Sequence, residues 1–348
     1  MSASTDSIQQ EPFENKLAVS FNLILRLYLI IPLCFLVYLA DVFFFGNNLQ
    51  TGLPNSPTHF LLFQILFGTP HIVASAILLS SNKEYIQFYK LKLISMTAII
   101  IVVFGIGGLY IPYKILYIIT ACWTVYHVFK QQHGIAKGVC RLPTWAFYWL
   151  LWLSVSAGIS IYIGIFLKNS LDVHQVEWVK LVAGVLTIGL ILSSILCQRY
   201  VKTGFGKTFL WSNTLLIVSS FYFYTQQYYF LAILVPRLVH DATAYVFYVT
   251  HDYNKHHQKP QNLIYQYAKK CHLHIFVILP LFSFVLTYIL QAYGDDMVNT
   301  ISKTFFDTEF RKAITLGVIG YLSLMHYYTE SFTWQAGSPL RRYIRFTK

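Results

Sequence analysis

The sequence predicts an all-α integral membrane protein, a polytopic bundle of about ten transmembrane helices. Two observations carry this prediction. Of the 348 residues, 56% are hydrophobic and only 11% are charged, whereas a soluble domain is typically about 25% charged. Stretches of about twenty apolar residues also recur along the whole chain, which is the length that a helix needs to cross a bilayer.

The apolar stretches fit ten spans in one membrane domain. A polar N-terminal tail (1–16) precedes the transmembrane domain (17–334), and a basic cytoplasmic tail (335–348) follows it. The segment 293–311 is expected to lie as a short amphipathic piece on the outer surface. The expected spans are 17–45, 58–80, 93–112, 113–131, 144–168, 178–197, 209–225, 228–251, 272–292 and 312–334.

The basic residues sort by loop. Lysines and arginines follow the even-numbered spans and fill the C-terminal tail, whereas the opposite loops are uncharged, mixed or acidic. The positive-inside rule therefore places both termini in the cytoplasm. The formal charge of +12 is explained by this topology and does not indicate nucleic acid as a partner. Anionic lipid headgroups at the inner face are expected partners instead.

The stretch 236–257 (PRLVHDATAYVFYVTHDYNKHH) is the most polar part of any expected span. It contains an arginine, two aspartates and four histidines. Ionisable residues at membrane depth are costly and mark functional sites by default. We therefore expect the site to be built around this stretch.

Three other even-numbered spans each bring one histidine to a similar depth. His71, His127, His240 and His326 lie in the inner half of their spans, at depths that differ by roughly 10 Å at most. Four imidazoles at one level of a bundle suit a divalent transition metal. For any one of them, the alternative is a hydrogen bond between helices.

Helical spacing adds polar residues to this site. Glu330 follows His326 by four residues and shares its face, as Gln131 does with His127. Glu330 is expected to be a fifth ligand or a base, and Gln131 is expected to orient an imidazole. Asp241 is expected to do the same, as an acceptor beside the ligands, so that Asp241 and Glu330 are the candidate catalytic residues.

Arg237 lies one turn before His240 and needs an anionic partner at this depth. Asp41 and Glu330 are the candidates. His251 lies roughly 16 Å along the helix from His240, so the two cannot bind one ion. For the three histidines after residue 250, a solvated loop that faces lipid headgroups is the simpler interpretation. The following residues are expected to form a separate cytoplasmic layer: His133, His251, Asp252, His256 and His257.

Aromatic residues are dense around the same positions. Packing and an interfacial belt are their usual roles, but an elongated pocket for an apolar substrate would have the same composition. Both interpretations remain open. The residues concerned are Tyr126, Tyr245, Phe247, Tyr248, Tyr327, Tyr328, Phe332 and Trp334.

Four short motifs within residues 68–330 resemble those of the bacterial Brp/Blh-type β-carotene 15,15′-dioxygenases. They are G-T-P-H at 68–71, Tyr-His at 126–127, a histidine in the eighth span and Met-His at 325–326. The resemblance implies a membrane protein whose intramembrane histidines bind iron, with His71, His127, His240 and His326 as ligands. Residues 72–75 read IVAS where the family has small residues and an acid, so carotene is not fixed as the substrate.

The leading hypothesis is an integral membrane oxidoreductase of the oxygenase type. A non-haem Fe(II) would activate O₂ as co-substrate and attack a hydrophobic lipid or polyene that enters from the bilayer. The expected location is the bacterial inner membrane, with the metal in its inner half and an electron donor as a further candidate partner. Two alternatives remain, a b-type haem protein for electron transfer and a transporter that uses buried His, Asp and Arg as a proton or ion relay.

Overall fold

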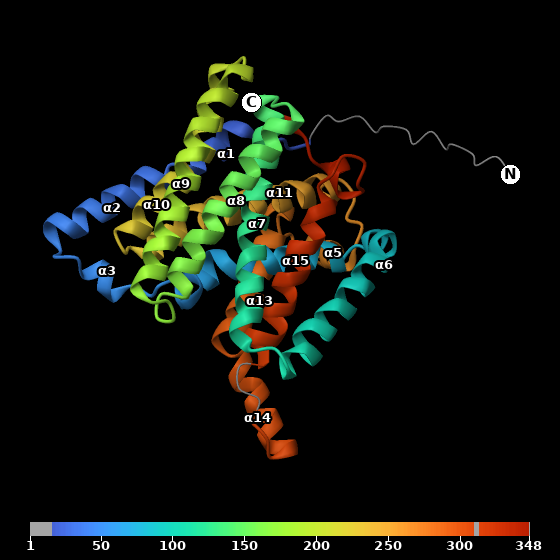
Figure 1. Cartoon of the computed structure of the whole chain (residues 1–348). Coiled ribbons are helices and arrows are strands. Elements are labelled where there is room, and N and C mark those ends of the chain that lie inside the picture. The colour runs from blue at the N-terminus through green and yellow to red at the C-terminus, as the bar shows by residue number, and fades with distance from the viewer. Residues whose placement is uncertain (1–15, 310–312, 348) are drawn as a thin grey trace.

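The computed structural model describes residues 16–309 and 313–347. The chain is helical apart from one parallel pairing of two-residue strands, so the all-α class is confirmed. In Figure 1, α11 lies at the centre of the molecule and α14 projects from one end. The predicted polar N-terminal tail (1–16) lies outside the described residues except for its last residue.

The elements follow in two groups. The first part of the chain contains β1 (Val19–Ser20), α1 (Phe21–Leu27), α2 (Ile30–Phe44), α3 (Asn48–Gly52), η1 (Pro57–His59), α4 (Leu61–Phe63), η2 (Gln64–Gly68), α5 (Thr69–Ser80), α6 (Lys83–Ile100), η3 (Ile101–Ile106), η4 (Gly107–Leu109) and α7 (Tyr113–Cys140). The second part contains α8 (Thr144–Phe166), α9 (Val173–Cys197), η5 (Gln198–Tyr200), α10 (Gly204–Thr225), α11 (Tyr229–His256), α12 (Leu263–Lys270), α13 (Ile275–Ala292), α14 (Gly294–Phe306), η6 (Ala313–Val318), α15 (Ile319–Thr333), η7 (Leu340–Tyr343) and β2 (Phe346–Thr347).

Seven helical segments in the described part of the chain are long and apolar enough to cross a membrane. Large apolar side chains on their outer faces are exposed, as expected for surfaces that meet lipid. These seven segments are Phe21–Phe44, Leu61–Ser80, Lys83–Leu109, Thr144–Phe166, Val173–Tyr200, Tyr229–His256 and Ile275–Ala292.

Each of the other three expected spans also coincides with helix, in α7, α10 and η6 with α15. The count of ten spans therefore remains a prediction, beside the seven found by length and composition. Their polar content is the physical difference: α7 carries lysine, glutamine and histidine in its second half, and α10 is rich in serine and threonine.

Two expected loops are helical instead. α6 begins at Lys83, so Lys83, Lys90 and Lys92 lie on its first turns, and α7 continues through the next expected loop as far as Cys140. In both places the predicted span was bounded where charged residues begin. However, Lys, Gln and Glu are good helix formers, so a helix continues past the point where its apolar stretch stops. The amphipathic segment 293–311 is helical over α14, as its pattern indicated.

Helix α11 is the central element. It packs against α10, α13, α5, α2 and α7, and 72% of its apolar window is buried, against 11% for the segment that contains α6. Pro236 inside α11 has no amide hydrogen to donate to the carbonyl of Ala232. The hydroxyl of Ser220 on α10 donates to this carbonyl instead, which is how a proline is accommodated inside a membrane helix.

The start of α5 is also irregular. The π-helical segment η2 ends at Gly68, and Pro70 occupies the first turn of α5. A side chain at Gly68 would have its Cβ 2.4 Å from Oε1 of Gln64. Thr69 donates to the same Gln64 oxygen at 3.2 Å and accepts from Gln291 of α13 at 2.8 Å. These contacts fix the backbone immediately before His71.

The two ends of the described chain meet beside α11. β1 and β2 pair in parallel, and the buried amide of Asn254 accepts from the nitrogen of Leu17 at 2.7 Å. The same amide donates to the carbonyls of Leu17 at 2.8 Å and Tyr343 at 2.7 Å. The C-terminal segment is thus packed against the bundle, with Leu340 and Ile344 buried.

Candidate metal centre

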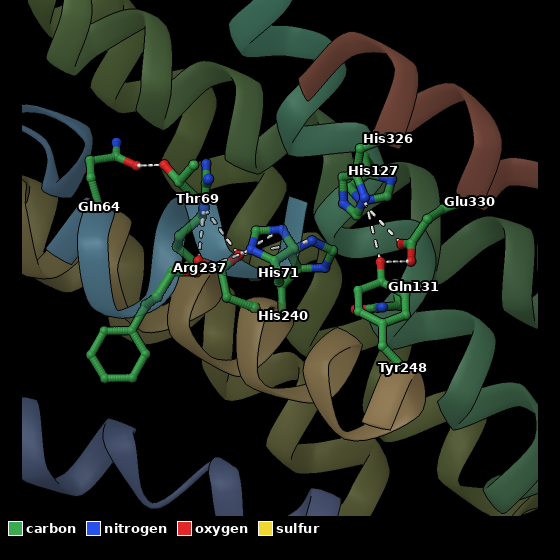
Figure 2. Close-up of polar contacts among 12 residues, drawn as sticks. Gln64, Thr69, His71, His127, Gln131, Arg237, His240, Tyr248, His326 and Glu330 are labelled. Carbon is green, nitrogen blue, oxygen red and sulfur yellow. Dashed lines mark hydrogen bonds and ion pairs between the residues drawn. The ribbon is translucent and has the colours of Figure 1, made fainter. Parts of the chain in front are cut away.

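The four histidines of the even-numbered spans meet at one point of the bundle. Their ring centroids are 4.9 Å apart for His71 and His326, 4.7 Å for His127 and His240, and 4.9 Å for His127 and His326. All four side chains are buried. Figure 2 shows them turned toward one another from α5, α7, α11 and α15, together with Glu330. These five residues are named the histidine centre below.

The donor atoms of the histidine centre form two compact groups that share His326. One group consists of His71, His240 and His326, and the other of His127, His326 and Glu330, with donor atoms within 4.8 Å of one another in each. Donors bound to one ion at about 2.1 Å cannot be more than about 4.2 Å apart. Each group is therefore close to the dimensions of a coordination sphere.

The tautomer of His71 is fixed by its backbone. Its Nδ1 lies 3.1 Å from the carbonyl oxygen of Phe67, and a carbonyl can only accept a hydrogen bond. Nδ1 therefore carries the proton, and the lone pair of the neutral ring is on Nε2. Nε2 is buried and has no hydrogen-bond partner within the described chain. This is the usual arrangement of a metal-binding histidine.

His326 is held in the same way by a side chain. The hydroxyl of Tyr248 donates to Oε1 of Glu330, so its oxygen accepts from Nδ1 of His326, at 3.4 Å. The indole of Trp334 donates to the same Oε1 at 2.9 Å. Nε2 of His326 and Oε2 of Glu330 are left without partners among the described residues, and both face the centre.

The remaining two histidines complete a set of electron-pair donors. Both ring nitrogens of His240 and Nε2 of His127 are buried without hydrogen-bond partners in the described chain. Nε2 of His127 lies 3.4 Å from Oε2 of Glu330. Lone pairs that face one another at such distances repel, and a bound cation removes this repulsion. The imidazole and carboxylate donors fit a first-row transition metal.

Arg237 finds its partner on its own helix. Its Nε lies 3.2 Å from Oδ1 and 3.1 Å from Oδ2 of Asp241, one turn away. The expectation that Asp41 or Glu330 would pair with Arg237 was wrong. Asp41 instead accepts from the backbone nitrogen of Leu49 at 3.0 Å and from Tyr228 at 2.9 Å.

Asp241 lies beside the imidazoles, but the predicted role of an acceptor that orients a ligand is not met at His71, whose lone pair on Nε2 faces the carboxylate. Its Oδ1 is 3.5 Å from Nε2 of His71 and 4.0 Å from Nε2 of His240. The positive charge of Arg237 cancels the negative charge of Asp241, so the pair adds no net charge beside the histidine centre. The oxygens of Asp241 retain lone pairs after the contacts with Arg237.

Gln131 and His133 do not reach the histidine centre. Oε1 of Gln131 accepts from its neighbour Gln132 at 3.3 Å, and no contact of Gln131 with an imidazole is seen. His133 is buried and lies 2.8 Å from the hydroxyl of Ser154 on α8. The contact of His133 joins α7 to α8, whereas that of Gln131 lies within α7.

The expected cytoplasmic layer is largely buried, and the simpler interpretation as a solvated loop was wrong for His251 and His256. His251, Asp252, Lys255 and His256 form what is named the inner cluster, at the end of α11. His257 is only partly buried and stacks on Tyr253, with ring centroids 5.0 Å apart.

Aromatic residues from distant parts of the chain cover the inner cluster. Nε2 of His251 lies 2.9 Å from the hydroxyl of Tyr85 on α6, and Tyr265 on α12 donates to Asp252. Burial raises the pKa of the Tyr265 phenol, so Tyr265 remains a neutral donor. Lys255 pairs with Glu84.

Two functional candidates were missed. The contacts of Tyr248 join α11 to α15, whereas Trp334 contacts Glu330 one turn away in its own segment. Tyr248 and Trp334 were counted among the aromatic residues, but they hold Glu330 and His326 through their polar atoms. Spacing gave a signal for both. Tyr248 lies eight residues, about two helical turns, after His240, and Trp334 lies four residues after Glu330.

Comparisons of the chain with protein-family models, with curated proteins and with solved structures gave no match. Its function is therefore inferred from the site alone.

Proposed function

We propose that the chain is a membrane oxidoreductase that uses one ferrous ion, bound at the histidine centre, and O₂ to oxidise a hydrophobic substrate. The observation that supports this most is the pair of fixed lone pairs. In both His71 and His326, the contact at Nδ1 keeps the proton on that nitrogen, so Nε2 carries a lone pair and can only accept. One cation placed between them would satisfy both at once.

The donor set favours iron. His127, His326 and Glu330 provide two imidazoles and one carboxylate, the combination that holds Fe(II) in oxygenases with open coordination positions. When bound, such an ion supplies the binding and activation of O₂. His71 and His240 form the second donor group with His326 and would provide further imidazole ligands.

Charge favours one ion over two. A divalent cation beside the carboxylate of Glu330 leaves one net positive charge, since Arg237 and Asp241 compensate each other. A second divalent cation would add two more charges in a buried site, at a large desolvation cost. The four imidazoles are neutral ligands and do not offset this charge.

The protein residues prepare the site in three ways. The carbonyl of Phe67 and the hydroxyl of Tyr248 select the tautomers of His71 and His326. Tyr248 and Trp334 fix one oxygen of Glu330, so that the other oxygen faces the centre. Burial of all four imidazoles limits the access of bulk water. The site is thus arranged before any ion binds.

An ion among four imidazoles is favoured over the two alternative functions. The rings are in contact with one another, at centroid distances between 4.7 and 6.3 Å, which suits a small ion better than a macrocycle inserted between two of them. For a relay of protons, ring nitrogens would need to alternate as donor and acceptor. The fixed tautomer of His71 does not favour that exchange.

Elemental analysis and a visible spectrum of the protein in mild detergent test the proposal. About one iron per chain and no Soret band are expected, with oxygen uptake when a lipid extract is added. Glu330→Gln should lose iron, because the amide keeps the shape of the side chain and removes the charge. Glu84→Gln is the matched control, since Glu84 pairs with Lys255 outside the histidine centre.

Other results would point elsewhere. A Soret band would indicate the haem protein. Protein that contains no metal after purification and does not bind added Fe(II) would contradict the proposal and favour the transporter.

A further inference from the structure

A cavity of about 480 Å³ lies against the side of the histidine centre. Its walls come from the N-terminal segment before and in α1, from η2, and from the facing sides of α11 and α13. Its lining is almost entirely apolar and includes Leu66, Val246, Val249 and Phe284. Sites for small molecules in proteins have volumes of about 300–1,000 Å³ and linings of this kind.

The outer end of the cavity is bordered by apolar side chains that are partly exposed. Leu23 is 44% exposed, Leu66 42%, Phe67 41% and Phe276 46%. They belong to segments that are apolar enough to cross a membrane, so this border faces lipid. A ligand would enter sideways from the bilayer.

The inner end reaches the histidine centre at one residue. Asp241 is the only ionisable carboxyl or basic group that lines the described cavity, and its Oδ1 is 3.5 Å from Nε2 of His71. Phe67 also lines the cavity, and its carbonyl fixes the tautomer of His71. A ligand group in contact with Asp241 therefore lies next to the metal ligands.

The polar groups of the lining define which ligand end fits there. The charge of Asp241 is balanced by Arg237, so a charged headgroup would be buried without a partner, at a high cost. The carboxylate still has lone pairs for a neutral donor, and hydrogen bonds to a charged acceptor are strong. The hydroxyl of Tyr245 is bonded to Ser283, at 2.7 Å. Ser20 and Thr250 also line the cavity, but Asp241 is the lining residue that adjoins His71, so we take it as the anchor.

We propose that the cavity binds a neutral, single-chain lipid alcohol, with its chain along α11 and α13 and its hydroxyl group on Asp241. The volume accommodates one chain and not a whole two-chain phospholipid. The assignment of this lipid alcohol as the substrate rests on the function proposed above. Binding in the cavity can be measured without any turnover.

Photolabelling in phosphatidylcholine nanodiscs tests the proposal. The probe is a 1-tetradecanol that carries a diazirine in its chain, and labelled peptides are identified by mass spectrometry. Labels are expected within 241–250 and 276–284. Unlabelled 1-tetradecanol should compete about tenfold better than tetradecane or tetradecanoate, because only the alcohol is both neutral and a donor to the carboxylate.

Three variants give the controls. Val246→Trp should fill the cavity and abolish labelling within these ranges. Leu281→Trp should not, because Leu281 on α13 is 43% exposed and does not line the cavity. Asp241→Asn should reduce the advantage of the alcohol over the alkane, because a neutral amide oxygen is a weaker acceptor than a carboxylate. The iron content of each variant is measured in parallel.

Three outcomes would overturn the proposal. These are labelling spread over all lipid-facing helices, labelling unaffected by Val246→Trp, and equal competition by alcohol and alkane in the unmodified chain. Specific labelling of protein that binds no iron would leave the lipid-alcohol site in place and contradict the oxidoreductase function alone. The two proposals can thus fail separately.

Discussion

Helix α11 carries two buried clusters that are alike in composition and opposite in how their polar atoms are used. In the histidine centre, five ring nitrogens and a carboxylate oxygen have no partner in the described chain. In the inner cluster, His251 has partners for both ring nitrogens, in Tyr85 and Asp252. Buried polar groups are nearly always paired. Among the described residues of the inner cluster only Nε2 of His256 lacks a partner, whereas six polar atoms of the histidine centre are left for a ligand to satisfy.

This difference separates a binding role from a structural one. A histidine whose nitrogens are satisfied by other side chains contributes to stability, and its loss leaves those partners unpaired. A histidine whose nitrogen faces other lone pairs contributes little until an ion binds. Substitutions in the two clusters should therefore change different quantities.

The largest effect is expected for His326→Ala. His326 belongs to both donor groups, so its loss should weaken iron binding by more than the tenfold to hundredfold that residues behind the ligands typically cost. Elemental analysis of purified protein measures this. His133→Ala is the control, because His133 is as buried and is bonded to Ser154. Normal iron content in His326→Ala would remove the basis for calling the two clusters different.

Tyr248→Phe should have the next largest effect. It removes the hydroxyl that holds His326 and Glu330, and we expect a tenfold to hundredfold loss in Fe(II) affinity with little change in thermal unfolding. Titration of the metal-free protein with Fe(II) measures the affinity. Tyr245→Phe, which removes a hydroxyl bonded to Ser283, should bind iron normally. An unchanged affinity in Tyr248→Phe would show that the tyrosine only packs.

The smallest effect is expected for the same change of tyrosine to phenylalanine beside the inner cluster, Tyr85→Phe. It leaves Nε2 of His251 without its partner and should lower stability by about 1 kcal/mol, with iron content unchanged. Thermal unfolding in detergent and elemental analysis together check this. Loss of iron in Tyr85→Phe would mean that the inner cluster also supports the metal and that the two clusters do not have separate roles.

The sequence was sufficient for those features that depend on local pattern. Apolar runs predicted the helices, and the depth of four histidines predicted that they would meet. Spacing placed Glu330 on the face of His326, and Glu330 is at the centre. Each of these follows from helical geometry within one segment, which is the part of folding that sequence reasoning reaches most directly.

Features that depend on contacts between distant segments were not predicted. The inner cluster was expected to be solvated because its own segment is polar, but Tyr85 and Tyr265 bury it from elsewhere in the chain. One local contact was missed as well. The partner of Arg237 was sought on other helices, although Asp241 lies one turn away on the same helix. The two predicted loops that are helical show that a helix can continue beyond the end of its apolar stretch.

The pairing of β1 with β2 has a consequence for the number of membrane crossings. The pairing and the clamp at Asn254 bring both ends of the described chain to one place. We therefore expect the two ends to lie on one side of the membrane. A chain that returns to its starting side crosses an even number of times. Seven is odd, so we expect at least one of α7, α10 and α15 to cross as well, and all three together give ten. Reporter proteins fused to the two ends should then signal from the same compartment.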